Sequence, residues 1–173
     1  KWLYLIPLLV FLCAFMLYPT FYCLIMSFTD YVLKSPPEFA GLENYRELLQ
    51  DTAFWQALWR TAYVLVVCIS VELILGMCFA LLLNREFMGQ NIVRGLCFLP
   101  LLISPLAMSL MWNYMLHVQF GVINQFSDWI GLGRHEWFSS QTYALYTIMF
   151  ISIWQWTPFS IFILLAGLRG MPK

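Results

Sequence analysis

The chain has 173 residues, of which 62% are hydrophobic, 18% aromatic and only 10% charged, and its formal net charge is zero. A soluble domain usually carries about 25% charged residues, so this composition indicates a membrane protein. The balanced charge argues against a nucleic-acid partner, which would select a basic surface.

Four long apolar stretches predict four membrane-spanning helices. A helix needs about 20 apolar residues to cross about 30 Å of hydrocarbon, and within lipid every backbone N–H and C=O must be bonded inside the protein. The expected fold class is therefore all-α, a polytopic membrane helix bundle forming one transmembrane domain over residues 1–173. The expected spans cover residues 2–29, 61–84, 95–116 and 138–168, and the expected outer loops cover 30–60 and 117–137.

The first span is too long for a signal-peptide core and lacks a clean small-residue cleavage site, so we expect a retained helix. It contains Pro7 and Pro19, which membrane helices tolerate because neighbouring helices bond the freed carbonyls. In the loop that follows, the apolar spacing over residues 42–59 predicts a helix. Its Trp55 and Trp59 suit the lipid headgroup level, where aromatic side chains gather.

The second span contains Glu72, the one ionisable group within the predicted spans. A carboxylate at such depth costs about 2.5–3.5 kcal/mol unless it is protonated, paired or hydrated. Glu72 is therefore either a proton or substrate contact or, as we expect, a structural group bonded to a neighbouring helix. The same span holds Gly76 and Ala80, a small-residue pair that permits close approach of two helices.

The third span carries Pro100 and Pro105 with a few polar residues between and after them. In the loop that follows, Val122, Phe126 and Trp129 recur at helical spacing, with Ile130 beside them. This pattern predicts a short helix lying on the outer surface.

The fourth span has an unusual centre that combines aromatic rings with polar groups around Pro158. Four residues recur at the spacing i, i+3, i+4, i+7 and so share one helix face. Rings can stack on the C–H faces of a sugar while amides and hydroxyls bond its hydroxyl groups; the alternative is ordinary packing within the bundle. The candidate substrate-binding residues are Ser152, Gln155, Trp156 and Phe159.

The charges of the loops predict the orientation. With four spans, one side carries five basic residues and one acidic residue, whereas the other carries four basic and seven acidic residues. The positive-inside rule then places both chain ends and the loop around residues 85–94 in the cytoplasm.

Catalytic and metal-binding patterns are absent from the sequence. It contains no H-E-x-x-H, G-x-S-x-G or P-loop motif, and its five cysteines lie in predicted spans without close pairing. We therefore expect no metal, no cofactor and no enzymatic activity, and any energy must come from a partner.

Several segments resemble bacterial ABC sugar permeases of the maltose-transporter-like group. Their order and spacing cover nearly the whole chain. The segments are residues 39–45 (FAGLENY), 72–76 (ELILG), 80–85 (ALLLNR), 98–100 (FLP) through Pro105 and Trp112, 121–124 (GVIN) and 167–172 (GLRGMP).

This resemblance implies a permease subunit of a binding-protein-dependent importer for a sugar or oligosaccharide in the bacterial cytoplasmic (inner) membrane. The implied partners are a second permease, two ATPase subunits and an extracytoplasmic sugar-binding protein. In the family the fourth core helix contributes to the sugar site, which coincides with Ser152, Gln155, Trp156 and Phe159.

The resemblance also implies that the chain is the N-terminal portion of a six-helix core. It stops just before the family's cytoplasmic EAA loop, after which the ATPase-docking helix and two further spans are expected. Two other readings stay open on the residues alone, an integral-membrane enzyme acting on lipid and a non-transporting membrane scaffold.

Overall fold

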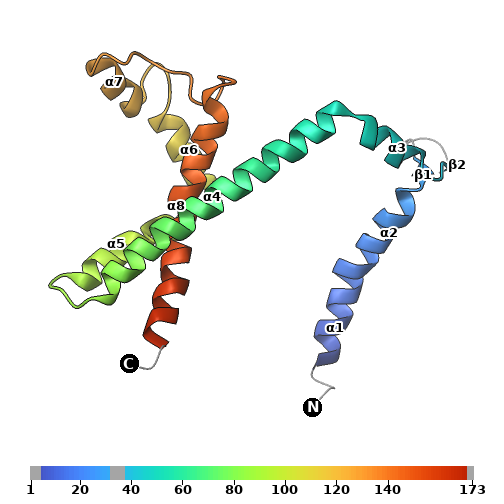
Figure 1. Cartoon of the computed structure of the whole chain (residues 1–173), viewed down its shortest axis with the longest axis horizontal. Coiled ribbons are helices and arrows are strands. Elements are labelled where there is room, and N and C mark those ends of the chain that lie inside the picture. The colour runs from blue at the N-terminus through green and yellow to red at the C-terminus, as the bar shows by residue number, and fades with distance from the viewer. Residues whose placement is uncertain (1–4, 32–37, 171–173) are drawn as a thin grey trace. The chain divides into compact units, whose positions relative to one another are not determined.

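The computed structural model describes residues 5–31 and 38–170, and these are mostly helical (Figure 1). The chain divides into two compact units, one ending at Thr61 and the other beginning at Ala62. Among the described residues, three helical segments are each long and apolar enough to cross a membrane, and a bent pair of helices is a fourth candidate if the pair forms one span. The predicted fold class, an all-α membrane bundle, is confirmed.

The first span runs without a break from Ile6 to Met26. It consists of α1 (Ile6–Leu12), a π-helical turn η2 (Cys13–Leu17) and α2 (Tyr18–Met26). Pro19 lies in the first turn of α2, directly after the π-helical turn. Because proline has no N–H to donate, a local widening of the helix accommodates it without a break.

The segment that follows α2 is fastened to the end of that helix. Strands β1 (Thr29–Asp30) and β2 (Glu38–Phe39) pair antiparallel, and Asn44 donates two hydrogen bonds, to the carbonyls of Ser27 and Thr29, each 3.0 Å long. The ring of Tyr45 contacts that of Phe28, with centroids 5.4 Å apart. The FAGLENY segment therefore folds the loop back onto the membrane helix.

The helix predicted over residues 42–59 is two helices, α3 (Glu43–Gln50) and the start of α4 (Thr52–Asn84). Asp51 between them is extended, and its side chain accepts a 2.8 Å bond from the Ala53 N–H. Such a cap starts a new helix. The second span thus begins at Thr52 rather than at residue 61, and its 33 residues reach about 50 Å, longer than the hydrocarbon core.

The turn after α4 is closed by side chains of α5 (Gln90–Leu102). Gln90 donates to the carbonyls of Leu83 and Arg85 at 2.6 and 2.7 Å, and Arg94 donates to that of Leu83 at 2.9 Å. These bonds satisfy carbonyls that a helix end leaves without intrahelical partners.

The third span is not the single helix expected over residues 95–116. It is α5 followed by α6 (Pro105–Met115), with a bend of 96° between them. Ile103 and Ser104 are extended, and the Ser104 hydroxyl caps α6 by accepting a bond from the Ala107 N–H. Because proline is favoured in the first turn of a helix and disfavours helix before it, the Ser104–Pro105 pair ends one helix and starts another.

The second unit is completed by α7 (Val122–Trp129) and α8 (Tyr143–Gly170). The short helix predicted in this segment is present as α7, and its apolar residues Val122, Phe126 and Trp129 are exposed. In Figure 1, α4 crosses α8, and α5 lies beside both. Two apolar clusters hold this unit together, Ala80, Leu83, Ile161 and Leu165 at one end and Met108, Trp112, Leu116 and Ile151 at the other.

Candidate functional site

All four residues predicted to bind sugar lie on one face of α8, near its middle. Trp156 and Phe159 are each 48% exposed, and their rings meet edge to face with centroids 6.3 Å apart. Ser152 and Gln155 beside them are half-buried. The helix runs unbroken through Pro158, so all four side chains keep helical spacing.

The two polar side chains of this face have no hydrogen-bond partner among residues 5–31 and 38–170. Elsewhere on α8, by contrast, the hydroxyls of Thr147 and Thr157 donate to the carbonyls of Tyr143 and Ile153. The Ser152 hydroxyl and the Gln155 amide form no hydrogen bond to another described residue. They are therefore available to a ligand or to a neighbouring chain.

The packed side of α8 lies elsewhere on the helix. Ile151 packs with Trp112, Ile161 and Leu165 pack with Leu83, and Trp154 meets the Trp112 ring edge to face at 5.5 Å. A cavity of about 320 Å³ beside Pro158 is lined from α4, α5 and α8, and none of the four candidate residues lines it. The face with Gln155 thus points away from the described core.

The crossing of α4 and α8 is closest at Gly76. A Cβ built on Gly76 would lie 2.8 Å from the Cβ of Ser160, and Ala80 one turn further is fully buried. The expected close approach through Gly76 and Ala80 is confirmed. Ser160 is therefore a packing residue.

Glu72 lies on the same side of α4, one turn before Gly76. One turn earlier still, the buried Cys68 thiol lies 4.0 Å from the Met149 carbonyl of α8. Glu72 is half-buried and faces α8, as expected of a group turned toward a neighbouring helix. The expected bond to that helix is not formed, because the carboxylate has neither a hydrogen bond nor an ion pair within the described part of the chain.

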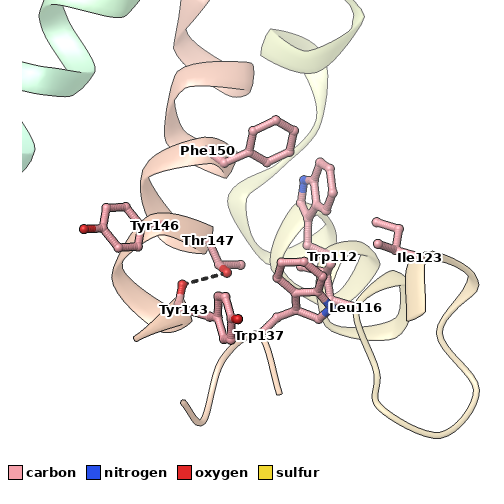
Figure 2. Close-up of a pocket in the computed structure, with 8 residues that line it drawn as sticks. All are labelled: Trp112, Leu116, Ile123, Trp137, Tyr143, Tyr146, Thr147 and Phe150. Atoms are coloured by element: carbon pink, nitrogen blue, oxygen red, sulfur yellow. Dashed lines mark hydrogen bonds between the residues drawn. The ribbon is translucent and has the colours of Figure 1, made fainter. Parts of the chain in front are cut away.

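A second, aromatic cavity lies at the N-terminal end of α8 and was not predicted (Figure 2). Its volume is about 370 Å³, and the spacing of Tyr143, Thr147 and Phe150 on α8 is the sequence signal that could have indicated it. The Thr147 hydroxyl donates to the Tyr143 carbonyl, and the buried Trp112 indole N–H has no partner among described residues. The lining residues are Trp112, Leu116, Ile123, Trp137, Tyr143, Tyr146, Thr147 and Phe150.

This aromatic cavity is poorly suited to a sugar. Each sugar hydroxyl buried without a partner costs about 1–3 kcal/mol, and the cavity walls offer few polar atoms. The face of α8 around Gln155 has both rings and unpaired polar groups, so its chemistry fits a sugar better.

The segment between α6 and α8 is held by Asn124, which the sequence analysis considered only as part of a motif. Its fully buried amide donates to the carbonyls of Leu116, His117 and His135 and accepts from the His135 N–H and the Trp137 indole, at 2.9–3.2 Å. At Gly121 a Cβ would lie 2.5–2.6 Å from backbone atoms of Met115 and His117. The GVIN segment is thus a structural clamp, in which only glycine fits the first position.

Among the described residues no three His, Cys, Asp or Glu side chains are placed to hold a metal ion. All five cysteines lie within those residues and are free thiols.

Comparison with known proteins identifies relatives over nearly the whole chain, although no protein-family model matches it. The chain is 35% identical over 158 residues to the probable ABC transporter permease protein y4oQ of Sinorhizobium fredii, an overlap of 90% of this chain and 51% of the relative. It is 29% identical over 175 residues to the trehalose/maltose transport system permease protein MalF of Thermococcus litoralis, covering 99% of this chain and 59% of the relative. The chain thus spans little more than half the length of these curated relatives.

A solved structure shares the fold. In the crystal structure of a bacterial ABC transporter involved in the import of the acidic polysaccharide alginate, one chain matches with a TM-score of 0.85 and 21% identity. The match covers 99% of this chain and 58% of that one.

Proposed function

Since this chain is related over nearly its whole length to the permease subunits of ABC sugar transporters, as its motifs predicted, we propose that it forms part of the path by which a sugar crosses the cytoplasmic membrane. The protein works as one permease of a binding-protein-dependent importer. Its substrate is a sugar or oligosaccharide, which it contacts through Ser152, Gln155, Trp156 and Phe159.

The observation that carries this proposal is the unpaired polar and aromatic face at the middle of α8. Transporter sites usually lie near the bilayer midplane, next to interrupted or irregular helices. Pro158 removes one helical hydrogen bond and leaves the Trp154 carbonyl without its N–H partner. The middle of α8 therefore brings together aromatic rings, an amide, a hydroxyl and a free carbonyl. These are the groups that bind a sugar.

The partners follow from the same relationship. We propose a second permease that completes the path, two ATPase subunits that supply energy, and an extracytoplasmic sugar-binding protein that delivers the substrate. A solved alginate transporter contains such a protein, bound to an alginate pentasaccharide. This chain has no nucleotide-binding motif, so ATP hydrolysis resides in the partners and the chain itself is a transport subunit rather than an enzyme.

Uptake of radiolabelled sugar by cells with matched subunit levels tests the site. Trp156→Ala removes a stacking surface and Gln155→Leu leaves a sugar hydroxyl unpaired. Such a loss costs about 1–3 kcal/mol, so we expect roughly 5- to 150-fold weaker apparent affinity.

Ile74→Ala, on the exposed side of α4, is the matched control and should transport normally. Ser160 is unsuitable as a control because it packs against Gly76, and Ile153 is unsuitable because it lines the cavity beside Pro158. Normal uptake by both site variants at saturating and limiting sugar would contradict the assignment.

A further inference from the structure

Two contacts fix the depth of Glu72 relative to α8. Cys68 meets Met149 and Gly76 meets Ser160, so residue numbers rise together along α4 and α8. Glu72 lies one helical turn from each of these α4 residues. The matching depth on α8 is midway between Met149 and Ser160, at Trp154 and Gln155.

The side of Glu72 is fixed as well. Cys68, Glu72 and Gly76 recur every four residues and therefore form one stripe of α4, and both ends of that stripe contact α8. On α8, Met149, Trp156 and Ser160 recur at helical spacing, so Trp156 lies on the flank that faces α4. The carboxylate is consequently next to the candidate sugar face.

No countercharge neutralises this group in the described part of the second unit. Its arginines, Arg85, Arg94, Arg134 and Arg169, lie at helix ends or in the outer loop, whereas Glu72 is in mid-helix. A lone carboxylate in a span is costly in lipid and marks a water-filled pathway or functional site. Half-burial of Glu72 beside the exposed ring of Trp156 fits a group that borders such a pathway.

We propose that Glu72 borders the sugar path beside Trp156 and makes it selective for uncharged, hydroxyl-rich sugars over uronic or sulfonated sugars. A carboxylate accepts hydrogen bonds from sugar hydroxyls and repels a carboxylate or sulfonate brought close to it. This inference rests on the proposed function, because it requires the α8 face to line the path.

Thiol chemistry at position 156 tests the inference without knowing the sugar. In a full-length, cysteine-free subunit assembled with its partners in lipid nanodiscs, Trp156→Cys is allowed to react with a cationic or an anionic methanethiosulfonate. We expect the cation to react faster. Glu72→Gln should lower the ratio of cation to anion rates about five-fold, the effect of one charge about 8 Å away in a watery path.

Two further variants serve as controls for the effect of the Glu72 charge. Glu72→Asp keeps the charge and should keep the ratio, while Glu136→Gln removes an exposed outer-loop charge and should leave the ratio unchanged. A ratio insensitive to Glu72→Gln would overturn the selectivity inference and leave the path assignment standing. No reaction of Trp156→Cys with either reagent would show that water does not reach this face, and the proposed function would fail with it.

Discussion

Gly76 of α4 and Ser160 of α8 meet so closely that a single added methyl group on the glycine would come within 2.8 Å of the serine Cβ. This contact sets the distance between the two helices, and it lies one turn of α4 beyond Glu72. The close packing of α4 on α8 and the proposed sugar path therefore lie at the same helix crossing.

The first prediction is that Gly76→Ala weakens the second unit. The new methyl must push the helices apart, and overpacking of this kind costs about 1–3 kcal/mol. The thermal midpoint of the purified complex should fall by several degrees, and adding Ser160→Gly should restore part of it. The control Gly167→Ala has open space around its Cβ and should leave the midpoint unchanged. An equal fall for both variants would contradict the close contact between Gly76 and Ser160.

The second prediction concerns Asn124. Asn124→Asp replaces a donor that serves three carbonyls with an oxygen that repels them, and each buried partner left unpaired costs about 1–3 kcal/mol. Hydrogen exchange should rise at His135, the N–H bonded to this side chain. The control Gln125→Ala removes one exposed bond, to the Phe120 carbonyl, and should not raise exchange at His135.

Orientation supplies a third prediction, which rests on the loop charges. In a cysteine-free subunit, a cysteine at position 134 should react with an impermeant thiol reagent in intact cells, whereas one at the fully exposed position 88 should not. Labelling at 88 together with silence at 134 would reverse the orientation.

The fourth prediction is that the subunit depends on partners for energy. The purified full-length permease should show no ATP hydrolysis, and activity should appear only when ATPase subunits are added. Hydrolysis by the permease alone would be incompatible with its proposed role.

The spans were predictable because length and hydropathy dominate inside lipid, and the surface helix was predictable because Val122, Phe126 and Trp129 keep helical spacing. The bend at Ser104 was not, since a Ser-Pro pair is also tolerated in continuous membrane helices when neighbours bond the freed groups. The start of α4 at Thr52 was not predicted either, for a related reason. A single extended residue, Asp51, separates two helices that share one apolar pattern.

One part of the candidate site could be predicted from the sequence and another part could not. The shared face of Ser152, Gln155, Trp156 and Phe159 follows from spacing on one helix. The nearness of Glu72 does not, because it depends on which helices cross and at which residue. Asn124 was missed because the amide bonds five groups, most of them backbone atoms whose positions no side-chain pattern encodes.

The Leu83 carbonyl receives bonds from both Gln90 and Arg94, and so the ends of α4 and α5 are tied through a single oxygen atom. These bonds hold the end of α4 and the start of α5 together across the turn between them. Because α4 also carries Glu72 and Gly76, a single helix joins this fastened turn to the crossing with α8.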